Sequence, residues 1–162
     1  MKQTDPSERE AEQASGRSLS LLVAEDDIHT RLSLDVTFRR AGVRALVVES
    51  ADALLERVAG MPEEERARID LLVTDLVMPG TMGEELIRKL DADGLFLPVV
   101  VITAYGAPEL EAEFRRRGHV TVLNKPFHPD DLVSAARDAR RRFEKENMAP
   151  DPSGSRATEG TP

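Results

Sequence analysis

Short, almost continuous apolar runs alternate along this chain with longer segments in which apolar residues recur at helical spacing. Runs of this kind, rich in Val, Leu and Ile, are typical of strands that are buried on both faces of a parallel sheet. The runs that predict strands cover residues 20–24, 45–48, 71–74, 99–103 and 120–123. Because a helical segment follows each run, the pattern predicts five consecutive β–α units around one parallel sheet.

The helical segments carry residues that begin and end helices. Asp27 and Ser50 are suited to cap the first two helices, and Gly42 and Gly60 stand where those helices should end. Prolines stand in the first turns of the last two predicted helices. The predicted helices cover residues 28–40, 51–59, 84–90, 108–118 and 129–145. The charged segment 61–69 is expected to face solvent.

The two ends of the chain lack this pattern. Residues 1–17 are polar and charged and are expected to form a disordered lead-in. Residues 147–162, which hold Pro, Gly, Ser and Thr, are expected to form a flexible tail. The segment between them, residues 18–146, is predicted to be one domain with a core of its own.

Composition narrows the classes of function. The chain has 22 Lys and Arg against 30 Asp and Glu, and the net charge of −8 disfavours direct binding to nucleic acid. Cysteine is absent, which excludes disulfides, thiolate metal ligands and cysteine nucleophiles. No apolar stretch approaches the roughly 18 residues that span a membrane, and the N-terminus has no apolar signal segment. A soluble cytoplasmic protein without membrane contacts is expected.

Polar residues stand at the ends of four predicted strands. Glu25 and Asp26 follow the first strand and Asp75 follows the third. Thr103 ends the fourth strand, and Lys125 comes just after the fifth. Because the carboxyl ends of parallel strands meet at one edge of a sheet, these side chains are expected to gather there. Three carboxylates, a hydroxyl and an ammonium together suit a divalent cation and a phosphoryl group.

The predicted cation ligands are Glu25, Asp26 and Asp75, with the backbone carbonyl of Val77 as a further candidate. Mg²⁺ takes oxygen ligands, usually one or two carboxylates together with water and phosphate oxygens. Asp27 is assigned to the helix cap, although Asp26 could share that role. The three histidines form no metal-binding pair, and the chain has no glycine-rich phosphate loop.

Asp75 is the predicted nucleophile, because a carboxylate can form an acyl phosphate. The turn at residues 78–80 and Gly83 after it permit a loop that aims backbone N–H groups at phosphate oxygens. Thr103 and Lys125 would supply a hydroxyl and a positive charge to the same phosphoryl group. The alternative is that Asp75 serves only as a third metal ligand or as a loop cap.

Four segments in this order resemble the receiver domain of two-component response regulators. They are residues 22–27 (LVAEDD), 75–83 (DLVMPGTMG), 101–104 (VITA) and 125–127 (KPF). The resemblance extends over residues 19–145 and implies an α/β, flavodoxin-like (βα)5 fold, a doubly wound parallel sheet with strand order 2-1-3-4-5. A cis bond before Pro126 is expected to aim the Lys125 ammonium inward.

The resemblance also implies a chemistry. A phosphohistidine of a histidine kinase or a histidine phosphotransfer protein would donate its phosphoryl group to Asp75, with Mg²⁺ as the required cofactor. Glu25, Asp26 and Asp75 match the metal ligands of the family, Thr103 matches its switch hydroxyl and Lys125 matches its lysine. The phosphorylated protein would be a phosphorelay intermediate or a terminal regulator.

Two features depart from the family pattern. Val122 stands three residues before Lys125, where receivers often carry Tyr or Phe, so the usual aromatic switch residue is missing. Tyr105, two residues after Thr103, could gate the pocket in its place or be a surface aromatic. The second departure is that no output domain accompanies the receiver, so a stand-alone, single-domain regulator is expected.

A stand-alone receiver is expected to act through contacts with other proteins. The resemblance implies that an unknown downstream target binds the face formed by the fourth helix, the fifth strand and the fifth helix. Three consecutive arginines at residues 115–117 and three more at 140–142 are predicted to make this face basic. Reversing the charges at 140–142 is expected to weaken target binding and to leave phosphorylation intact. A monomer, or a weak phosphorylation-promoted dimer through this face, is expected.

Two other functions fit parts of this sequence. A phosphorylation-independent interaction module would keep only the fold, and the full set of polar residues at the strand ends argues against it. A phosphatase acting on small molecules would need a second acid two residues after the nucleophile, where Val77 stands. The protein is therefore expected to catalyse only its own phosphorylation and dephosphorylation.

Overall fold

The computed structural model describes residues 18–104, 112, 114 and 116–148 of the chain. The predicted lead-in, Tyr105, most of the predicted helix at 108–118 and residues 149–162 of the predicted tail lie outside these described residues. Within the described part, no helix is both long enough and apolar enough to cross a membrane.

Five parallel strands form one sheet in the order β2-β1-β3-β4-β5. The strands are β1 (Ser20–Ala24), β2 (Arg44–Val48), β3 (Leu71–Asp75), β4 (Val99–Thr103) and β5 (Val120–Asn124). This confirms the predicted parallel α/β sheet and its strand order. In the register, Asp75 of β3 lies beside Ile102 of β4, and Thr103 lies beside Asn124 of β5. The residues that end these strands therefore share one edge of the sheet.

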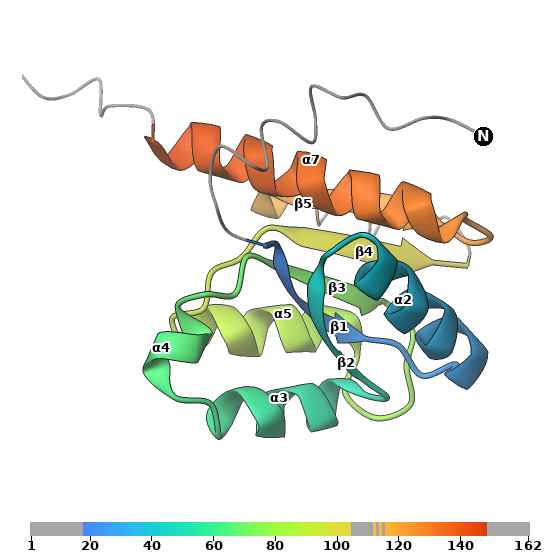
Figure 1. The fold of residues 1–162 in the computed structure, drawn as a ribbon. Helices are drawn as coiled ribbons and strands as arrows, with labels where there is room; N and C mark the ends of the chain where they lie inside the picture. The colour runs from blue at the N-terminus through green and yellow to red at the C-terminus, as the bar shows by residue number, and fades with distance from the viewer. Residues whose placement is uncertain (1–17, 105–111, 113, 115, 149–162) are drawn as a thin grey trace, which may run out of the picture.

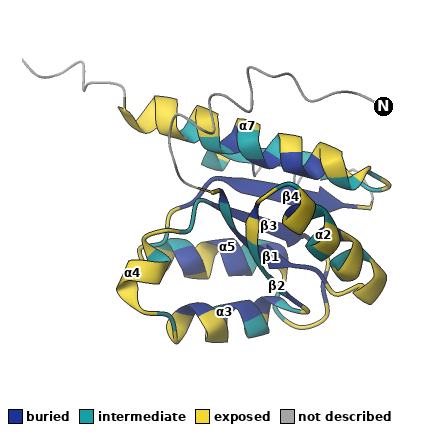
Figure 2. Cartoon of the chain, viewed as in Figure 1, coloured by how far each residue is buried: buried dark blue, intermediate teal, exposed yellow. Residues whose placement is uncertain are grey.

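Helices cover both faces of the sheet, as Figure 1 shows. The helices are α2 (Ile28–Arg40), α3 (Ala51–Ala59), α4 (Glu63–Arg66), α5 (Gly83–Ala92) and α7 (Pro129–Met148). Side chains of α2 and α7 pack on one face, and those of α3 and α5 pack on the other. Figure 2 shows α3 and α5 buried on the side that meets the sheet and exposed on the outer side.

The burial of the strands explains the apolar runs in the sequence. Every residue of β3 and β4 is buried, because these strands lie inside the sheet with helices on both faces. Successive residues of β1 contribute to opposite layers: Leu22 packs with α3 and α5, whereas Leu21 and Val23 pack with α2 and α7. The edge strand β5 is only partly buried.

The predicted helix caps are present. The Asp27 carboxylate accepts the Thr30 N–H at 2.7 Å, and Ser50 Oγ accepts the Ala53 N–H at 3.1 Å. Gly42, which follows the last turn of α2, has a positive φ of 69° that suits glycine.

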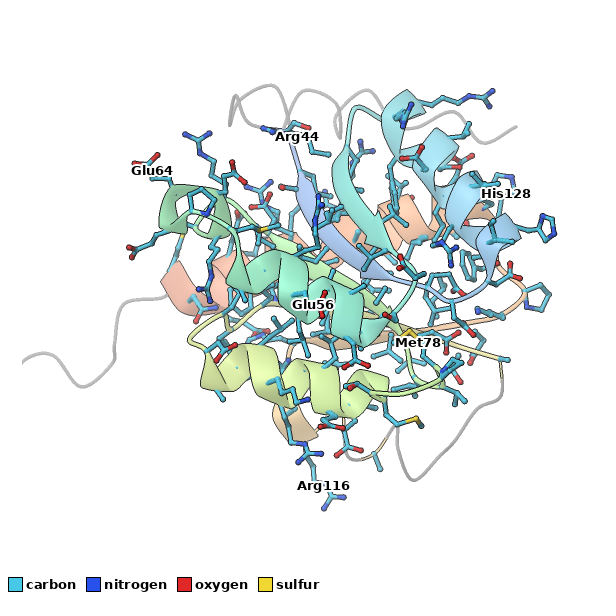
Figure 3. All side chains as sticks on the ribbon, turned by 90° about the horizontal axis from the view of Figure 1, so that it is seen from below. Arg44, Glu56, Glu64, Met78, Arg116 and His128 are labelled. Carbon is cyan, nitrogen blue, oxygen red and sulfur yellow. The ribbon has the colours of Figure 1, made fainter. Side chains whose placement is uncertain are left out.

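Several boundaries differ from the prediction: β3 and β5 each run one residue further, to Asp75 and Asn124, and α5 spans Gly83–Ala92 instead of residues 84–90. Strand β2 begins at Arg44, one residue earlier than expected, because an exposed arginine is tolerated at the start of an edge strand. Helix α7 runs to Met148, two residues past the predicted end of the domain. The charged segment 61–69 contains the short helix α4, whose glutamates are exposed as expected. Figure 3 places Glu64 of α4 and His128, which follows β5, at opposite ends of the molecule.

Candidate functional site

Three carboxylates converge at the carboxyl edge of β1 and β3. Glu25 and Asp26 directly follow β1, and Asp75 is the last residue of β3. One oxygen atom of each side chain lies within 4.8 Å of the others. Glu25 and Asp75 are buried, whereas Asp26 is exposed. Three carboxylate oxygens at such short mutual distances can ligate a divalent cation.

Glu25 is the most deeply buried member of this cluster. Its Oε1 accepts the Asp27 N–H at 3.0 Å. Its Oε2 lies 3.1 Å from Lys125 Nζ, within ion-pair range, yet it receives no well-directed hydrogen bond. Burial raises the pKa of Glu25 above its ordinary value, although the Asp27 N–H and Lys125 act against the shift. The Lys125 ammonium offsets part of the cost of burying this oxygen, and because the oxygen receives no hydrogen bond it can still accept a further ligand, so this donor set fits a metal ion.

Lys125 reaches the cluster from the end of β5. Its Nζ donates to Asp75 Oδ2 at 2.7 Å, and its backbone N–H donates to the Thr103 carbonyl at 2.7 Å. The bond before Pro126 is cis, as predicted. Partial burial by itself would lower the pKa of Lys125, but its hydrogen bonds to Asp75 and Glu25 outweigh that effect and the pKa is raised. Lys125 therefore stays charged among the carboxylates.

The two oxygens of Asp75 have different partners. Oδ1 accepts the Val77 N–H at 3.0 Å, while Oδ2 binds Lys125. The side chain is 10% exposed, so a small part of it remains in contact with solvent. The Thr74 hydroxyl donates to the Asp75 backbone carbonyl at 2.9 Å. Both the carboxylate and the peptide group of Asp75 are thus held in place.

The loop after β3 returns close to its own starting point. A Cβ atom added at Gly83 would lie 2.4 Å from the Asp75 carbonyl oxygen, a distance that only glycine avoids. Thr81 Oγ1 donates to the Asp52 carboxylate of α3 at 2.6 Å, and this bond lowers the pKa of Asp52. Met78 is buried with the core residues of α3 and α5, and Figure 3 shows it beside α3. Met78 therefore anchors the loop in the core, and the anchored loop places the Val77 N–H against Asp75.

The structure brings Glu25, Asp26, Asp75 and Lys125 together and places Thr103 at the same edge, buried at the end of β4. Val122 lies inside β5 beside Val101 and is partly buried. The side chain of Val77 is exposed, and the role of its carbonyl as a metal ligand stays a prediction. Tyr105 lies outside the described residues, so its gating role also stays a prediction.

Sequence reasoning missed Arg31, which supports this site from α2. Its Nη1 donates to the backbone carbonyls of Glu25 and Asp26. The signal in the sequence was an arginine five residues after the acidic pair, inside the predicted helix. That spacing alone does not distinguish a supporting arginine from one that faces solvent.

The arginines expected to form a basic binding face are largely paired in the structure. Arg117 donates to both carboxylate oxygens of Asp91, at 3.1 and 2.6 Å. Arg140 lies 2.8 Å from Glu144 and 3.6 Å from Asp70. Arg141 pairs with Asp138, and Arg142 donates to Thr121 Oγ1 at 2.6 Å. The prediction of a basic face is corrected for Arg117, Arg140 and Arg141, since carboxylates pair with their guanidinium groups, whereas the neutral Thr121 hydroxyl does not compensate the charge of Arg142.

Comparison with known proteins gives a consistent result. Residues 21–137 match the family described as the response regulator receiver domain. The transcriptional regulatory protein FixJ of Azorhizobium caulinodans is 32% identical over 134 residues, which cover 83% of this chain and 61% of that protein. The C4-dicarboxylate transport transcriptional regulatory protein DctD of Pseudomonas aeruginosa is 33% identical over 130 residues, covering 78% of this chain and 27% of that protein. The chain thus spans less than two thirds of the length of these relatives.

Solved structures share the fold. A response regulator receiver domain protein from Clostridium thermocellum superposes with a TM-score of 0.68 at 22% identity, covering 79% of this chain and 98% of that one. The chemotaxis protein CheY4 of Vibrio cholerae gives 0.66 at 22% identity, covering 76% and 99%. The match over residues 21–137 includes every residue of the acidic cluster and Lys125. The chain therefore belongs to the response regulator receiver domain family of two-component signalling.

Proposed function

We propose that this receiver accepts a phosphoryl group on Asp75 from a phosphohistidine of a histidine kinase or a histidine phosphotransfer protein. The observation that carries the proposal is the pairing of Asp75 with Lys125 beside two further acids at the carboxyl edge of the sheet. A nearly buried carboxylate with a fixed cationic partner suits nucleophilic attack followed by charge neutralisation.

The proposed transfer is a displacement at phosphorus. A carboxylate oxygen of Asp75 attacks, the new P–O bond forms as the P–N bond of phosphohistidine breaks, and the imidazole leaves with the electron pair and takes up a proton. Lys125 Nζ, at 2.7 Å from Asp75 Oδ2, is placed to follow the negative charge onto the phosphoryl oxygens. The Val77 N–H, already directed at Asp75 Oδ1, can donate to the same group.

Glu25, Asp26 and Asp75 would hold a magnesium ion, whose charge would offset the negative charge of the phosphoryl oxygens beside these carboxylates. Oε2 of Glu25 supports this assignment, because it is buried and, although it lies 3.1 Å from Lys125 Nζ, it receives no hydrogen bond from the described residues. Asp27 is excluded from the set, since its carboxylate caps α2 through the Thr30 N–H.

Thr103 is the proposed switch hydroxyl. It is buried at the end of β4, and its carbonyl accepts the backbone N–H of Lys125. Movement of Thr103 toward a phosphoryl group would act on β5 and so on a surface that binds an as yet unidentified protein target. We infer no enzymatic turnover of other substrates, because Val77 stands where such an enzyme needs a second acid. The oligomeric form that fits this scheme is a monomer or a weak phosphorylation-promoted dimer.

The experiment is intact-mass analysis after incubation with Mg²⁺ and acetyl phosphate. Wild type should gain one phosphoryl group in a Mg²⁺-dependent reaction, and Asp75→Asn should gain none. Asp27→Asn is the matched control: it removes a neighbouring acid that lies outside the cluster, so it should still be phosphorylated. Absence of the adduct in wild type, together with absence of Mg²⁺ binding, would support the alternative of a phosphorylation-independent interaction module.

A further inference from the structure

Arg31 lies at the start of α2, behind the acidic cluster, and the proposed phosphoryl transfer gives it no role. Its Nη1 donates to the carbonyl of Glu25 at 2.9 Å and to the carbonyl of Asp26 at 2.8 Å. These two acceptors are the backbone carbonyls of residues whose side chains supply two of the three carboxylates. One guanidinium nitrogen therefore fixes two consecutive residues of the candidate metal site.

The rest of the segment is held by a chain of local hydrogen bonds. The Asp27 N–H donates to Glu25 Oε1, and the Asp27 carboxylate accepts the Thr30 N–H. The Arg31 N–H in turn donates to the Asp27 carbonyl at 2.9 Å. Glu25 is thereby anchored through its side chain as well as its backbone. Asp26 is exposed, and in this set of contacts its backbone carbonyl accepts the hydrogen bond from Arg31.

Two physical effects of Arg31 on a bound cation have opposite signs. Its positive charge repels a cation and would lower the affinity of the cluster. Its hydrogen bonds orient two ligand-bearing residues and would raise the affinity, as residues that position metal ligands do. The hydrogen bonds are short and direct, whereas Arg31 is partly exposed, so water weakens its long-range repulsion. Within the described part of the chain, its guanidinium forms no ion pair with the three carboxylates, so Arg31 does not compete with a metal for their oxygens.

We propose that Arg31 is a positioning residue, which holds residues 25–27 in the conformation in which Glu25 and Asp26 face Asp75 and thereby raises the affinity of the cluster for a divalent cation. This inference rests on the proposed function. It concerns the backbone of the site, so it also predicts a property of the metal-free protein.

The test is calorimetric titration of Mg²⁺ into wild type, Arg31→Met, Arg31→Lys and Arg40→Met, with thermal unfolding as the check on folding. Arg31→Met should raise the Kd for Mg²⁺ by about tenfold. Arg40→Met removes the same charge from the last residue of α2 and should leave the Kd unchanged. Arg31→Lys keeps the charge and a donor group, so its Kd should be intermediate, and it replaces Arg31→Met if that variant does not fold.

A second measurement needs no metal. Hydrogen exchange of the Asp27 amide, which is bonded to Glu25 Oε1, should be faster in Arg31→Met than in wild type. An equal or lower Kd for Mg²⁺ in Arg31→Met, the sign expected from charge repulsion alone, would overturn the proposal. If wild type binds no Mg²⁺ but the Asp27 amide still exchanges faster in the variant, Arg31 does position the segment and the proposed metal-dependent function is the part that fails.

Discussion

At the scale of single residues, Gly83 determines how closely the loop after β3 approaches Asp75. A Cβ atom at this position would lie 2.4 Å from the Asp75 carbonyl oxygen, so the loop and the strand end would have to separate. The Asp75 carboxylate also receives the Val77 N–H from this loop. The geometry of Asp75, the proposed phosphoryl acceptor, therefore depends on a residue that has no side chain.

We expect Gly83→Ala to lower the free energy of unfolding by about 1–3 kcal/mol, the usual cost of forcing extra atoms into a well-packed region. It should also weaken Mg²⁺ binding, because Asp75 is displaced. Urea denaturation and metal titration measure the two effects. Gly60→Ala is the control: its added Cβ would lie 3.6 Å from the Glu56 carbonyl oxygen, so stability should be unchanged or slightly higher. Equal effects of the two substitutions would contradict the steric argument.

At the scale of the elements, α7 is anchored by ion pairs as well as by its apolar face. Leu132, Val133, Ala136 and Ala139 are buried against the sheet. Arg140, whose side chain is only 17% exposed, extends this face toward Asp70 at the start of β3. Arg141, one residue later, is exposed and pairs with Asp138 on the same helix. Arg140 thus connects α7 to the residue before β3, whereas Arg141 pairs within α7.

We expect Arg140→Glu to destabilise the protein by about 1–3 kcal/mol, because it leaves the nearly buried Asp70 without this cation and adds a like charge. Arg141→Glu should change stability by no more than about 0.5 kcal/mol, as exposed substitutions usually do. Chemical denaturation of both variants provides the measurement. Similar losses in the two variants would show that Arg140 is no more structural than its neighbour. Reversing all three arginines at 140–142 would therefore test folding as well as target binding.

Helix α2 carries a row of exposed apolar side chains beside the site. Ile28, Leu32 and Val36 recur every four residues and are 55%, 60% and 47% exposed. This spacing lines them along one side of the helix, and the row begins three residues after Glu25. Exposed apolar side chains that form a contiguous patch are often sites of protein contact. We expect the phosphodonor protein to use this row when it approaches Asp75.

Leu32→Glu should slow phosphotransfer from the cognate donor protein by about tenfold or more, the effect of losing roughly 1.4 kcal/mol of contact energy. Phosphorylation by acetyl phosphate should not change, since that donor needs no docking surface. Ser33→Glu adds the same charge to an exposed position off the row and is the matched control. Equal slowing by both variants, or slowing with acetyl phosphate as well, would rule out a specific role for the row.

At the scale of the whole molecule, the buried acid Glu25 is expected to lower the stability of the metal-free protein at neutral pH. Burial raises the pKa of Glu25, so the folded protein binds its proton more tightly than the unfolded chain does. The stability of the metal-free protein should then fall as pH rises from the ordinary value of 4.5 through the raised pKa, and stay low above it. This cost at neutral pH is what we expect if the ionised carboxylate serves as a ligand of the proposed cation.

We expect metal-free Glu25→Gln to unfold at a higher temperature than wild type at neutral pH, since glutamine is neutral in both states. The difference should shrink as pH falls toward 4.5, where the wild-type carboxyl regains its proton. Thermal unfolding across this range is the measurement. A variant less stable than wild type at every pH would contradict the expected cost of burying Glu25.

Addition of Mg²⁺ should make wild type more stable than Glu25→Gln. At about 100 times its Kd, a ligand that binds only the folded state adds about 2.7 kcal/mol to the free energy of unfolding. Wild type should gain this stability on addition of Mg²⁺, whereas Glu25→Gln should gain little. Addition of EDTA, which removes the Mg²⁺, should return wild type to its metal-free stability.

The sequence by itself predicted the five strands and the helices α2, α3, α5 and α7, but not the short helix α4. Strand and helix periods are local, as are the caps Asp27 and Ser50, so they could be predicted from neighbouring residues. The grouping of Glu25, Asp26, Asp75 and Lys125 also followed, because parallel strands bring their carboxyl ends to one edge. The strand order came from the resemblance of four motifs to a known family, since local periodicity does not encode which strands are neighbours.

Only the tertiary structure decided which contacts these residues make. Arg117 and Arg140 were expected to give free positive charge, yet Asp91 and Asp70, far away in the sequence, lie against them. The support of the acidic segment by Arg31 and the close approach of Gly83 to Asp75 were likewise absent from any spacing rule. Such contacts depend on how helices pack on the sheet and on side-chain conformation. A sequence pattern determines which face a residue occupies, and the packed fold determines which atom it meets there.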